Sequence, residues 1–144
     1  MSTVLSQSKR ALAAEVWRRM FDYFMSTSGE RLRILAELDL TPNDSRALHT
    51  LDGLAGRTMR SLAEEWSCDA SNATWIVNRL ETRGLVERRA KPGDGRVKLV
   101  VLTAFGEKTR DRLKDAMYFP PQDLLEMPTA ALQALKAAML KLPR

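Results

Sequence analysis

The residues whose chemistry points most clearly to a function are the basic side chains concentrated in residues 79–98. Seven basic residues stand against three acidic ones there, and seven minus three gives a net charge of +4. Residues 1–56 are neutral by comparison, with seven basic and seven acidic groups. Clustered cations suit the binding of phosphate groups, so this pattern favours a nucleic-acid partner. The alternative interpretation is a solvated surface loop.

Much of this charge is expected on a β-hairpin. The apolar runs 85–88 and 97–102 are typical of two short strands, and a basic loop that contains Pro92 joins them. Gly93 and Gly95 are expected to supply the unusual φ angles that such a loop requires. The sequence therefore predicts a small hairpin whose basic tip projects from the molecule.

Two helices are predicted directly before this hairpin. Residues 59–66 indicate a short helix and residues 70–83 a longer one, with Thr58 and Asp69 as their N-caps. The longer helix has one apolar face at i, i+3, i+4, i+7 spacing and one polar face. A short helix, a tight turn and a longer helix with a polar outer face form a helix-turn-helix arrangement. A helix of this kind fits the major groove of DNA, which is ~12 Å wide.

The side chains expected to contact DNA lie on these two helices and on the hairpin. Short polar groups near a helix N-terminus can bond base edges, and arginines can clamp phosphates. Asp94 and Arg96 are spaced to form an ion pair that would hold the arginine extended. The full set of candidates is Arg57, Arg60, Ser71, Asn72, Thr74, Trp75, Asn78, Arg79, Arg83, Lys91, Asp94, Arg96 and Lys98. Packing of the helix pair and hairpin without any DNA contact is the alternative.

The N-terminal part of the chain reads as two helical segments. Residues 9–38 are expected to form one long segment, which Gly29 bends or interrupts because glycine costs ~1 kcal/mol against alanine in a helix. Thr41 and Pro42 signal the start of a second helix. This helix is expected to run to about Leu54, with that leucine on its inner face.

The C-terminal part predicts two further helices. Thr103 is placed to cap a helix that runs to about Tyr118, and Thr129 to cap a last helix with an apolar stripe. The first helical segment carries a matching surplus of large apolar residues. The two surfaces could pack within one chain or between two chains.

The composition excludes several classes of protein. With 144 residues, 44% hydrophobic and 28% charged, the chain fits one folded domain, and it has no apolar run near the ~20 residues of a membrane span. Its N-terminus lacks the pattern of a signal peptide, and its single cysteine, Cys68, fits a reducing cytoplasm. That thiol is expected to be a packed turn residue. The only histidine, His49, cannot build a metal site alone. No cofactor motif occurs, so neither a cofactor nor enzymatic activity is expected.

Over residues 58–106 the chain resembles the MarR family of winged helix-turn-helix regulators. The resemblance rests on Leu62-Ala63, on Ser71 through Glu81, on Gly84-Leu85-Val86-Glu87-Arg88, on Asp94-Gly95-Arg96 and on Leu102-Thr103-Ala104-Phe105-Gly106, in the family's order and spacing. It implies a mainly α fold with a small β-hairpin wing. Residues 70–83 would read the major groove and the wing, residues 89–97, the minor groove. Arg96 matches the family's wing arginine, which Asp94 would orient. Trp75 and Gly95 depart from the family pattern, which often has arginine at both positions.

The resemblance further implies a homodimer that binds a pseudo-palindromic operator, usually as a repressor, in a bacterial or archaeal cytoplasm. A winged-helix module that binds protein rather than DNA remains the alternative. The chain would divide into an N-terminal dimerisation helix (1–40), a DNA-binding lobe (41–103) and C-terminal dimerisation helices (104–144), within one compact domain. The expected dimerisation residues are Leu12, Val16, Met20, Leu132, Leu135, Met139 and Leu142. A small aromatic or anionic ligand would contact Trp17, Arg18, Phe21, Arg46 and His49.

Overall fold

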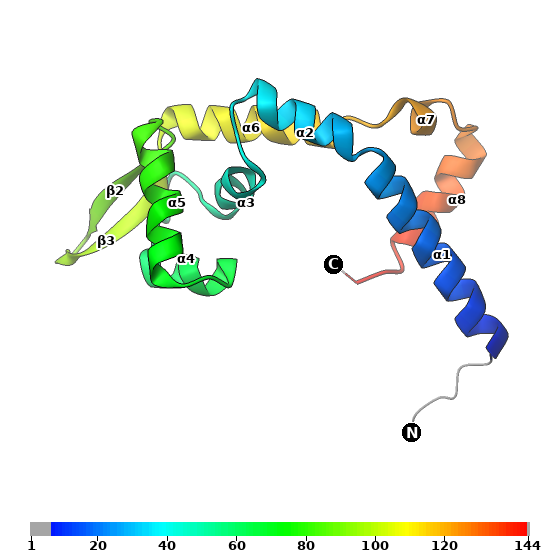
Figure 1. Cartoon of the computed structure of the whole chain (residues 1–144), viewed down its shortest axis with the longest axis horizontal. Coiled ribbons are helices and arrows are strands. Elements are labelled where there is room, and N and C mark those ends of the chain that lie inside the picture. Colours follow the sequence, from blue (N-terminus) through cyan, green and yellow to red (C-terminus); the bar gives the residue numbers. More distant parts are fainter. Residues whose placement is uncertain (1–6, 144) are drawn as a thin grey trace.

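A computed structural model describes residues 7–143 of the chain, which form helices around one small antiparallel sheet. Figure 1 shows α3, α4, α5 and the sheet at one end, α1 and α8 at the other, and α2 and α6 between them. No helix of the described part is long and apolar enough to cross a membrane. The elements are α1 (Gln7–Ser26), α2 (Ser28–Glu37), α3 (Pro42–Thr50), β1 (Arg57–Thr58), α4 (Met59–Trp66), α5 (Ala70–Thr82), β2 (Val86–Lys91), β3 (Asp94–Leu102), α6 (Ala104–Tyr118), α7 (Gln122–Leu125) and α8 (Thr129–Met139).

The predicted hairpin is present, and a third strand extends it. The strand order is β1-β3-β2, so the two-residue strand β1 pairs with the hairpin's second strand. Both hairpin strands reach further toward the tip than the apolar runs indicated, which leaves Pro92 and Gly93 as the turn. Gly93 has a φ of 83°, as predicted, whereas Gly95 has no positive φ and the prediction there was wrong. The proline-glycine pair alone makes the turn, so Gly95 can keep strand geometry.

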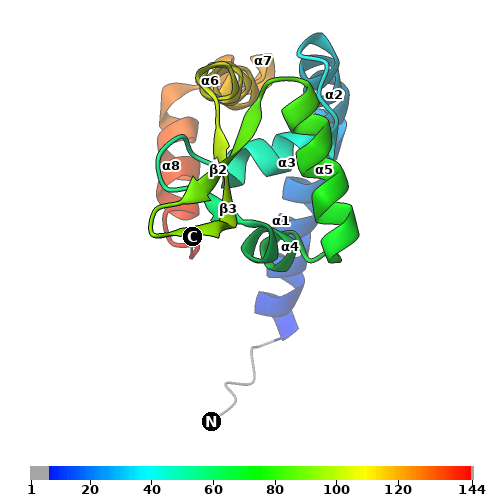
Figure 2. The ribbon, with the colours of Figure 1, turned by 90° about the vertical axis from the view of Figure 1, so that its left-hand side faces the viewer.

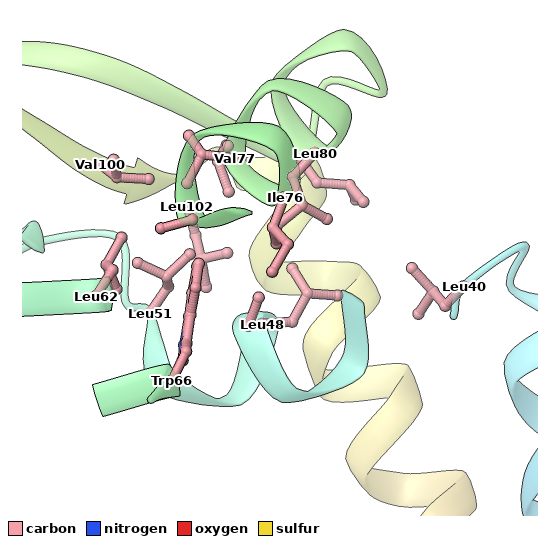
Figure 3. Close-up of a cluster of buried hydrophobic side chains, with 14 of the residues drawn as sticks. Leu40, Leu48, Leu51, Leu62, Trp66, Ile76, Val77, Leu80, Val100 and Leu102 are labelled. Atoms are coloured by element: carbon pink, nitrogen blue, oxygen red, sulfur yellow. The ribbon is translucent and has the colours of Figure 1, made fainter. Parts of the chain in front are cut away.

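A continuous apolar core fills the lobe of residues 41–103 and fixes its helices against the sheet, and Ile34, Leu35 and Leu40 from before the lobe and Leu113 of α6 extend it (Figure 3). Leu48, Leu62, Val77 and Leu80 are fully buried and come from α3, α4 and α5. Trp66 closes this core, and its indole N–H donates to Thr50 Oγ1 at 3.0 Å. Because a buried indole needs such a partner, α4 is held against the end of α3.

The first helical segment breaks at Thr27, so the prediction of a break at Gly29 was wrong. The Ser26 hydroxyl donates to the Tyr23 carbonyl at 2.7 Å, and the Thr27 hydroxyl donates to the Phe24 carbonyl at 2.9 Å. Hydroxyl groups that bond the backbone in this way compete with the helical ladder and bend it. Gly29 lies inside α2, where nothing approaches within 4 Å of an added Cβ.

The helix that begins at Pro42 also ends earlier than predicted. α3 stops at Thr50, and Leu54 is 95% exposed instead of lying on an inner face. The Asp52 carboxylate accepts from the N–H groups of Leu54 and Ala55, both at 2.7 Å. This local turn replaces further helical hydrogen bonds, as Asp side chains commonly do.

The C-terminal helices confirm one predicted cap and correct another. Thr103 accepts from the Gly106 N–H at 3.0 Å, and α6 ends at Tyr118 as expected. Pro128 is the N-cap of α8 and Thr129 is its first helical residue, so the predicted threonine cap was wrong. Proline suits that boundary because its ring keeps the backbone extended without needing a side-chain bond. The four-residue α7 had no clear signal in the sequence.

The first turn of α6 packs directly against the backbone at the base of the hairpin, with no side chain between them. A Cβ added to Gly106 would lie 1.9 Å from the carbonyl oxygen of Leu85, a backbone atom that cannot move aside. Thr103 reinforces the junction because its N–H donates to the same carbonyl at 3.1 Å. The base of the hairpin is therefore anchored on the first turn of α6.

Candidate nucleic-acid interface

The turn between α4 and α5 sets the direction of the longer helix, which we call the reading helix. Ser67 has a φ of 52°, a left-handed conformation that ends α4, and Asp69 then caps α5. The Asp69 carboxylate accepts from the Asn72 N–H at 2.7 Å and from the Ser71 hydroxyl at 2.8 Å. These two hydrogen bonds hold the pKa of Asp69 below its usual range, because they stabilise the charged form.

The outer face of the reading helix is polar and exposed, as the sequence predicted. Ser71, Asn72, Thr74, Trp75 and Asn78 are all exposed, whereas the residues that alternate with them are buried in the core. The Thr74 hydroxyl donates to the Ala70 carbonyl at 2.8 Å and keeps its lone pairs for other donors. This face therefore offers several donors and acceptors to an incoming partner. Figure 2 shows α5 and the hairpin at the same end of the molecule.

The tip of the hairpin carries three cations that have no partner within residues 7–143. Lys91, Arg96 and Lys98 are exposed, and their side chains make no hydrogen bond or ion pair in the described chain. Asp94 accepts from the backbone N–H of Arg96 at 3.2 Å, in place of the expected ion pair with its guanidinium. The strand register also shifts at the tip, from Ala90 opposite Lys98 to Lys91 opposite Asp94. Arg96 lies inside this irregularity.

Two of the expected phosphate clamps point into the protein instead. Arg79 bonds the carboxylate of Asp44, with Nε 3.2 Å from Oδ2, and Arg83 Nη1 lies 3.9 Å from the same oxygen. Arg83 also donates to the Leu38 carbonyl at 3.2 Å and pairs with Asp39. Asp44 is only 1% exposed, so the cluster ties the reading helix to the start of α3.

The other two expected phosphate clamps, Arg57 and Arg60, also have partners within the chain. Arg57 Nη1 lies 2.5 Å from Glu65 Oε2, and Arg57 Nε donates to Ser61 Oγ at 3.1 Å, so this side chain lies along α4. Arg60 pairs with Glu64 at 3.3 Å on the exposed side of the helix. An exposed pair of this kind contributes little to stability, so Arg60 is free to exchange its partner for a phosphate.

Sequence reasoning missed two residues that hold the site together. Arg88, on β2, donates to Glu81 Oε1 and to Asn78 Oδ1, both at 2.7 Å, and so ties the hairpin to the reading helix. Asp44 did carry a local signal, because Thr41 and Asp44 form a capping box at the start of α3. Its contact with Arg79 spans 35 residues and has no local signature.

The residues expected at a dimer interface are largely exposed in the single chain. α1, α7 and α8 contain no buried residue. Met20 and Leu132 are half-buried, and the other five candidates are exposed: Leu12, Val16, Leu135, Met139 and Leu142.

The residues expected to bind a ligand do not share a pocket in the described chain. Trp17 and Phe21 pack against each other on α1, with ring centroids 6.4 Å apart, and Arg18 is exposed beside them. Arg46 and His49 lie on α3, which Figure 1 shows well away from α1. His49 Nδ1 lies 2.7 Å from the Ser45 carbonyl oxygen, a local contact. A shallow groove does lie between α2 and α6, and its lining residues are Ile34, Glu37, Leu38, Arg112, Asp115 and Ala116.

Within residues 7–143, no group of His, Cys, Asp and Glu residues is arranged to hold a metal ion. Cys68, in the turn before the reading helix, is half-buried and packs against the apolar core. This position agrees with its expected role as a packed turn residue.

Comparison with known proteins shows what the lobe and its hairpin are similar to. The model of the MarR family matches residues 38–97, which include α3, both helices of the helix-turn-helix and the wing. No curated protein matches the chain.

Solved structures of MarR regulators share the fold over most of their length. The multiple antibiotic-resistance repressor MarR from Listeria monocytogenes is 20% identical, with a TM-score of 0.78 and 94% of each chain covered. The apo form of MarR from E. coli is 25% identical, with a TM-score of 0.63 over 86% of this chain and 96% of that one. MepR from S. aureus, in a complex with DNA, is 22% identical, with a TM-score of 0.61 over 87% and 96%.

Proposed function

We propose that this chain is a winged helix-turn-helix transcriptional regulator of the MarR family, and not an enzyme, and that it binds double-stranded DNA as a dimeric, sequence-specific repressor. The observation that carries the proposal is the pairing of an exposed polar helix face with a hairpin tip whose cations are unpartnered in the described chain. The DNA complex of MepR, which has the same fold, supports it.

In this proposal the reading helix enters the major groove and the wing enters the minor groove. Ser71, Asn72, Thr74, Trp75 and Asn78 face the base edges, where short polar side chains can both donate and accept. Arg96 enters the minor groove, whose concentrated negative potential attracts a guanidinium. Asp94 shapes the backbone that presents it.

The remaining candidates fall into two groups, according to whether a carboxylate of the same chain already pairs with their charge. Lys91, Lys98 and Arg60 contact phosphates directly, because they are unpaired or only weakly paired at the surface. Their contribution is affinity that does not depend on sequence. Arg57, Arg79 and Arg83 are held by carboxylates, so their role is to position α4 and α5.

A dimer would place two reading helices about one DNA turn, ~34 Å, apart, as a pseudo-palindromic operator requires. The exposed apolar surface of α1 and α8 supports this arrangement, because large exposed patches mark interaction sites. A small aromatic or anionic ligand that releases the DNA would then bind beside Trp17, Arg18 and Phe21. Arg46 and His49 lie on α3, away from α1 in the single chain, so they would join this site only where dimerisation brings the two helices together. Such a regulator acts where the chromosome lies, in a bacterial or archaeal cytoplasm.

Titration of labelled random DNA at increasing salt concentration tests the proposal against a winged-helix module that binds only protein. Three cations on each of two protomers, Lys91, Lys98 and Arg60, would neutralise about six phosphates, so the affinity should fall by at least ~10³ between 50 and 200 mM salt. Absence of binding at 50 mM salt would favour the protein-binding module instead.

A further inference from the structure

Trp75 stands apart from the other large exposed hydrophobic side chains. Most of these belong to α1, α2, α7, α8, the end of α6 and the residues directly after α6 and α8, and the proposed dimer surface of α1 and α8 holds many of them. Among the described residues, only Leu54, Trp75 and Phe105 lie elsewhere. Trp75 is 59% exposed and lies on the reading helix, so dimerisation would not cover it.

The indole has no partner in the described part of the chain. Its side chain makes no hydrogen bond, ring contact or cation–π contact within residues 7–143, whereas the buried Trp66 bonds Thr50. Its neighbours on the helix surface are the exposed polar residues Ser71, Asn72 and Asn78. A large apolar ring thus lies at the centre of a polar face.

Two contacts fix the rotation of the reading helix and hence the direction of this ring. Arg79, four residues on, is held by the buried Asp44 at 3.2 Å. Asn78, three residues on, accepts from Arg88 of the hairpin at 2.7 Å. Because both flanks of the helix are tied to the protein, Trp75 is presented in a set orientation.

We propose that Trp75 selects thymine at one position of each half-site through contact between its indole ring and the thymine 5-methyl group. This inference rests on the proposed function and specifies what the reading helix recognises. The thymine methyl is the apolar group of the major groove, where the other base edges present hydrogen-bonding atoms. An unpartnered apolar ring on a helix that faces this groove therefore matches thymine better than any other base.

The experiment compares thymine with uracil, which lacks only the 5-methyl group. DNA is first selected from a random library with the purified full chain, and the selected duplexes are then synthesised with thymine or uracil at each conserved T. For the unaltered chain, uracil should weaken binding about fourfold per half-site, the effect expected for one apolar carbon group returned to water. Trp75→Ala should bind both duplexes equally, and Trp75→Phe should keep part of the discrimination.

Phe105→Ala is the matched control. Phe105 is 57% exposed in the first turn of α6, which adjoins the C-terminal end of the reading helix, and it is not part of its polar face. This variant should discriminate thymine from uracil as the unaltered chain does.

Three results would overturn the inference while leaving DNA binding intact. These are selected sites without a conserved thymine, equal binding of thymine and uracil duplexes by the unaltered chain, and persistence of the discrimination in Trp75→Ala. The third result would take the form of an equal fold-loss of affinity for both duplexes in Trp75→Ala, which leaves their ratio unchanged and indicates contact with sugar or phosphate. Failure to bind any DNA at low salt would overturn the proposed function together with this inference.

Discussion

At the scale of single residues, the interface depends on which charges the protein has already neutralised. Sequence alone identified the basic cluster and assigned Arg96 to the wing, but it counted Arg79 and Arg83 as phosphate clamps. The structure separates Arg96, with an unpartnered guanidinium in the described chain, from Arg79 and Arg83, whose carboxylate partner Asp44 lies on another helix. Contacts between residues so far apart in the chain depend on tertiary packing and leave no local pattern. The N-caps Thr58, Asp69 and Thr103 were predictable because their hydrogen bonds span three residues.

Replacing Arg96 with alanine should weaken binding to selected DNA by about 1–3 kcal/mol. The melting temperature should not change, because the side chain is exposed and bonds nothing in the described chain. Binding isotherms and thermal melts of the purified variant measure both quantities.

Arg112→Ala is a suitable control, since it removes the same charge from an exposed position on α6, outside the lobe. An Arg96→Ala protein with a much lower melting temperature and intact DNA binding would contradict the assignment of this residue to the interface.

At the scale of elements, the lobe works as a frame that holds a helix and a hairpin at a set spacing. Periodicity predicted α4, α5 and α6 almost to the residue, because each has strong caps and an apolar face. It did not predict β1, since a strand of two residues has no period to detect. Periodicity and composition placed the helix break at Gly29 instead of Thr27. Two hydroxyl–backbone hydrogen bonds near Thr27 outweigh the intrinsic cost of a glycine in the helix.

Gly106→Ala should disturb this frame by separating α6 from the base of the hairpin. The added carbon would lie 1.9 Å from the Leu85 carbonyl oxygen, so the helix must shift, and overpacking of this kind costs about 1–3 kcal/mol of unfolding free energy. Urea denaturation with linear extrapolation measures the change.

Gly29→Ala provides the comparison within the same chain. It lies in α2 with nothing within 4 Å of the new carbon, so stability should stay the same or rise by up to ~1 kcal/mol. Equal stabilities of the two variants would show that the α6–hairpin contact is not a tight one in solution.

At the scale of the whole molecule, a single chain consists of a packed lobe and of terminal helices whose side chains are mostly exposed. The sequence predicted the apolar stripes of α1 and α8, but periodicity cannot say whether a stripe is covered by the same chain or by another. The described chain leaves them uncovered: α1 and α8 contain no buried residue, whereas α3, α4 and α5 do.

Truncation before Thr129 should therefore convert the proposed dimer into monomers and leave the lobe folded. Light scattering coupled to size-exclusion chromatography gives the mass, and circular dichroism reports the remaining helices. A variant with Leu135→Lys and Met139→Lys tests the same surface in the full chain, because both side chains are exposed in one protomer.

Leu54→Lys is the control, since Leu54 is also exposed but lies outside the terminal helices. A folded dimer that survives both the truncation and the double substitution would count against α8 as part of the interface.

The exposed faces of α1 and α8 have a consequence for how operator occupancy would depend on the cellular concentration of such a regulator. If two copies must meet before either can hold its half-site firmly, operator occupancy rises with the square of protein concentration while dimers are scarce. A gene under its control would then respond to a threshold of expression rather than in proportion to it. Variants that weaken the contact between terminal helices would move that threshold without touching a single residue of the lobe.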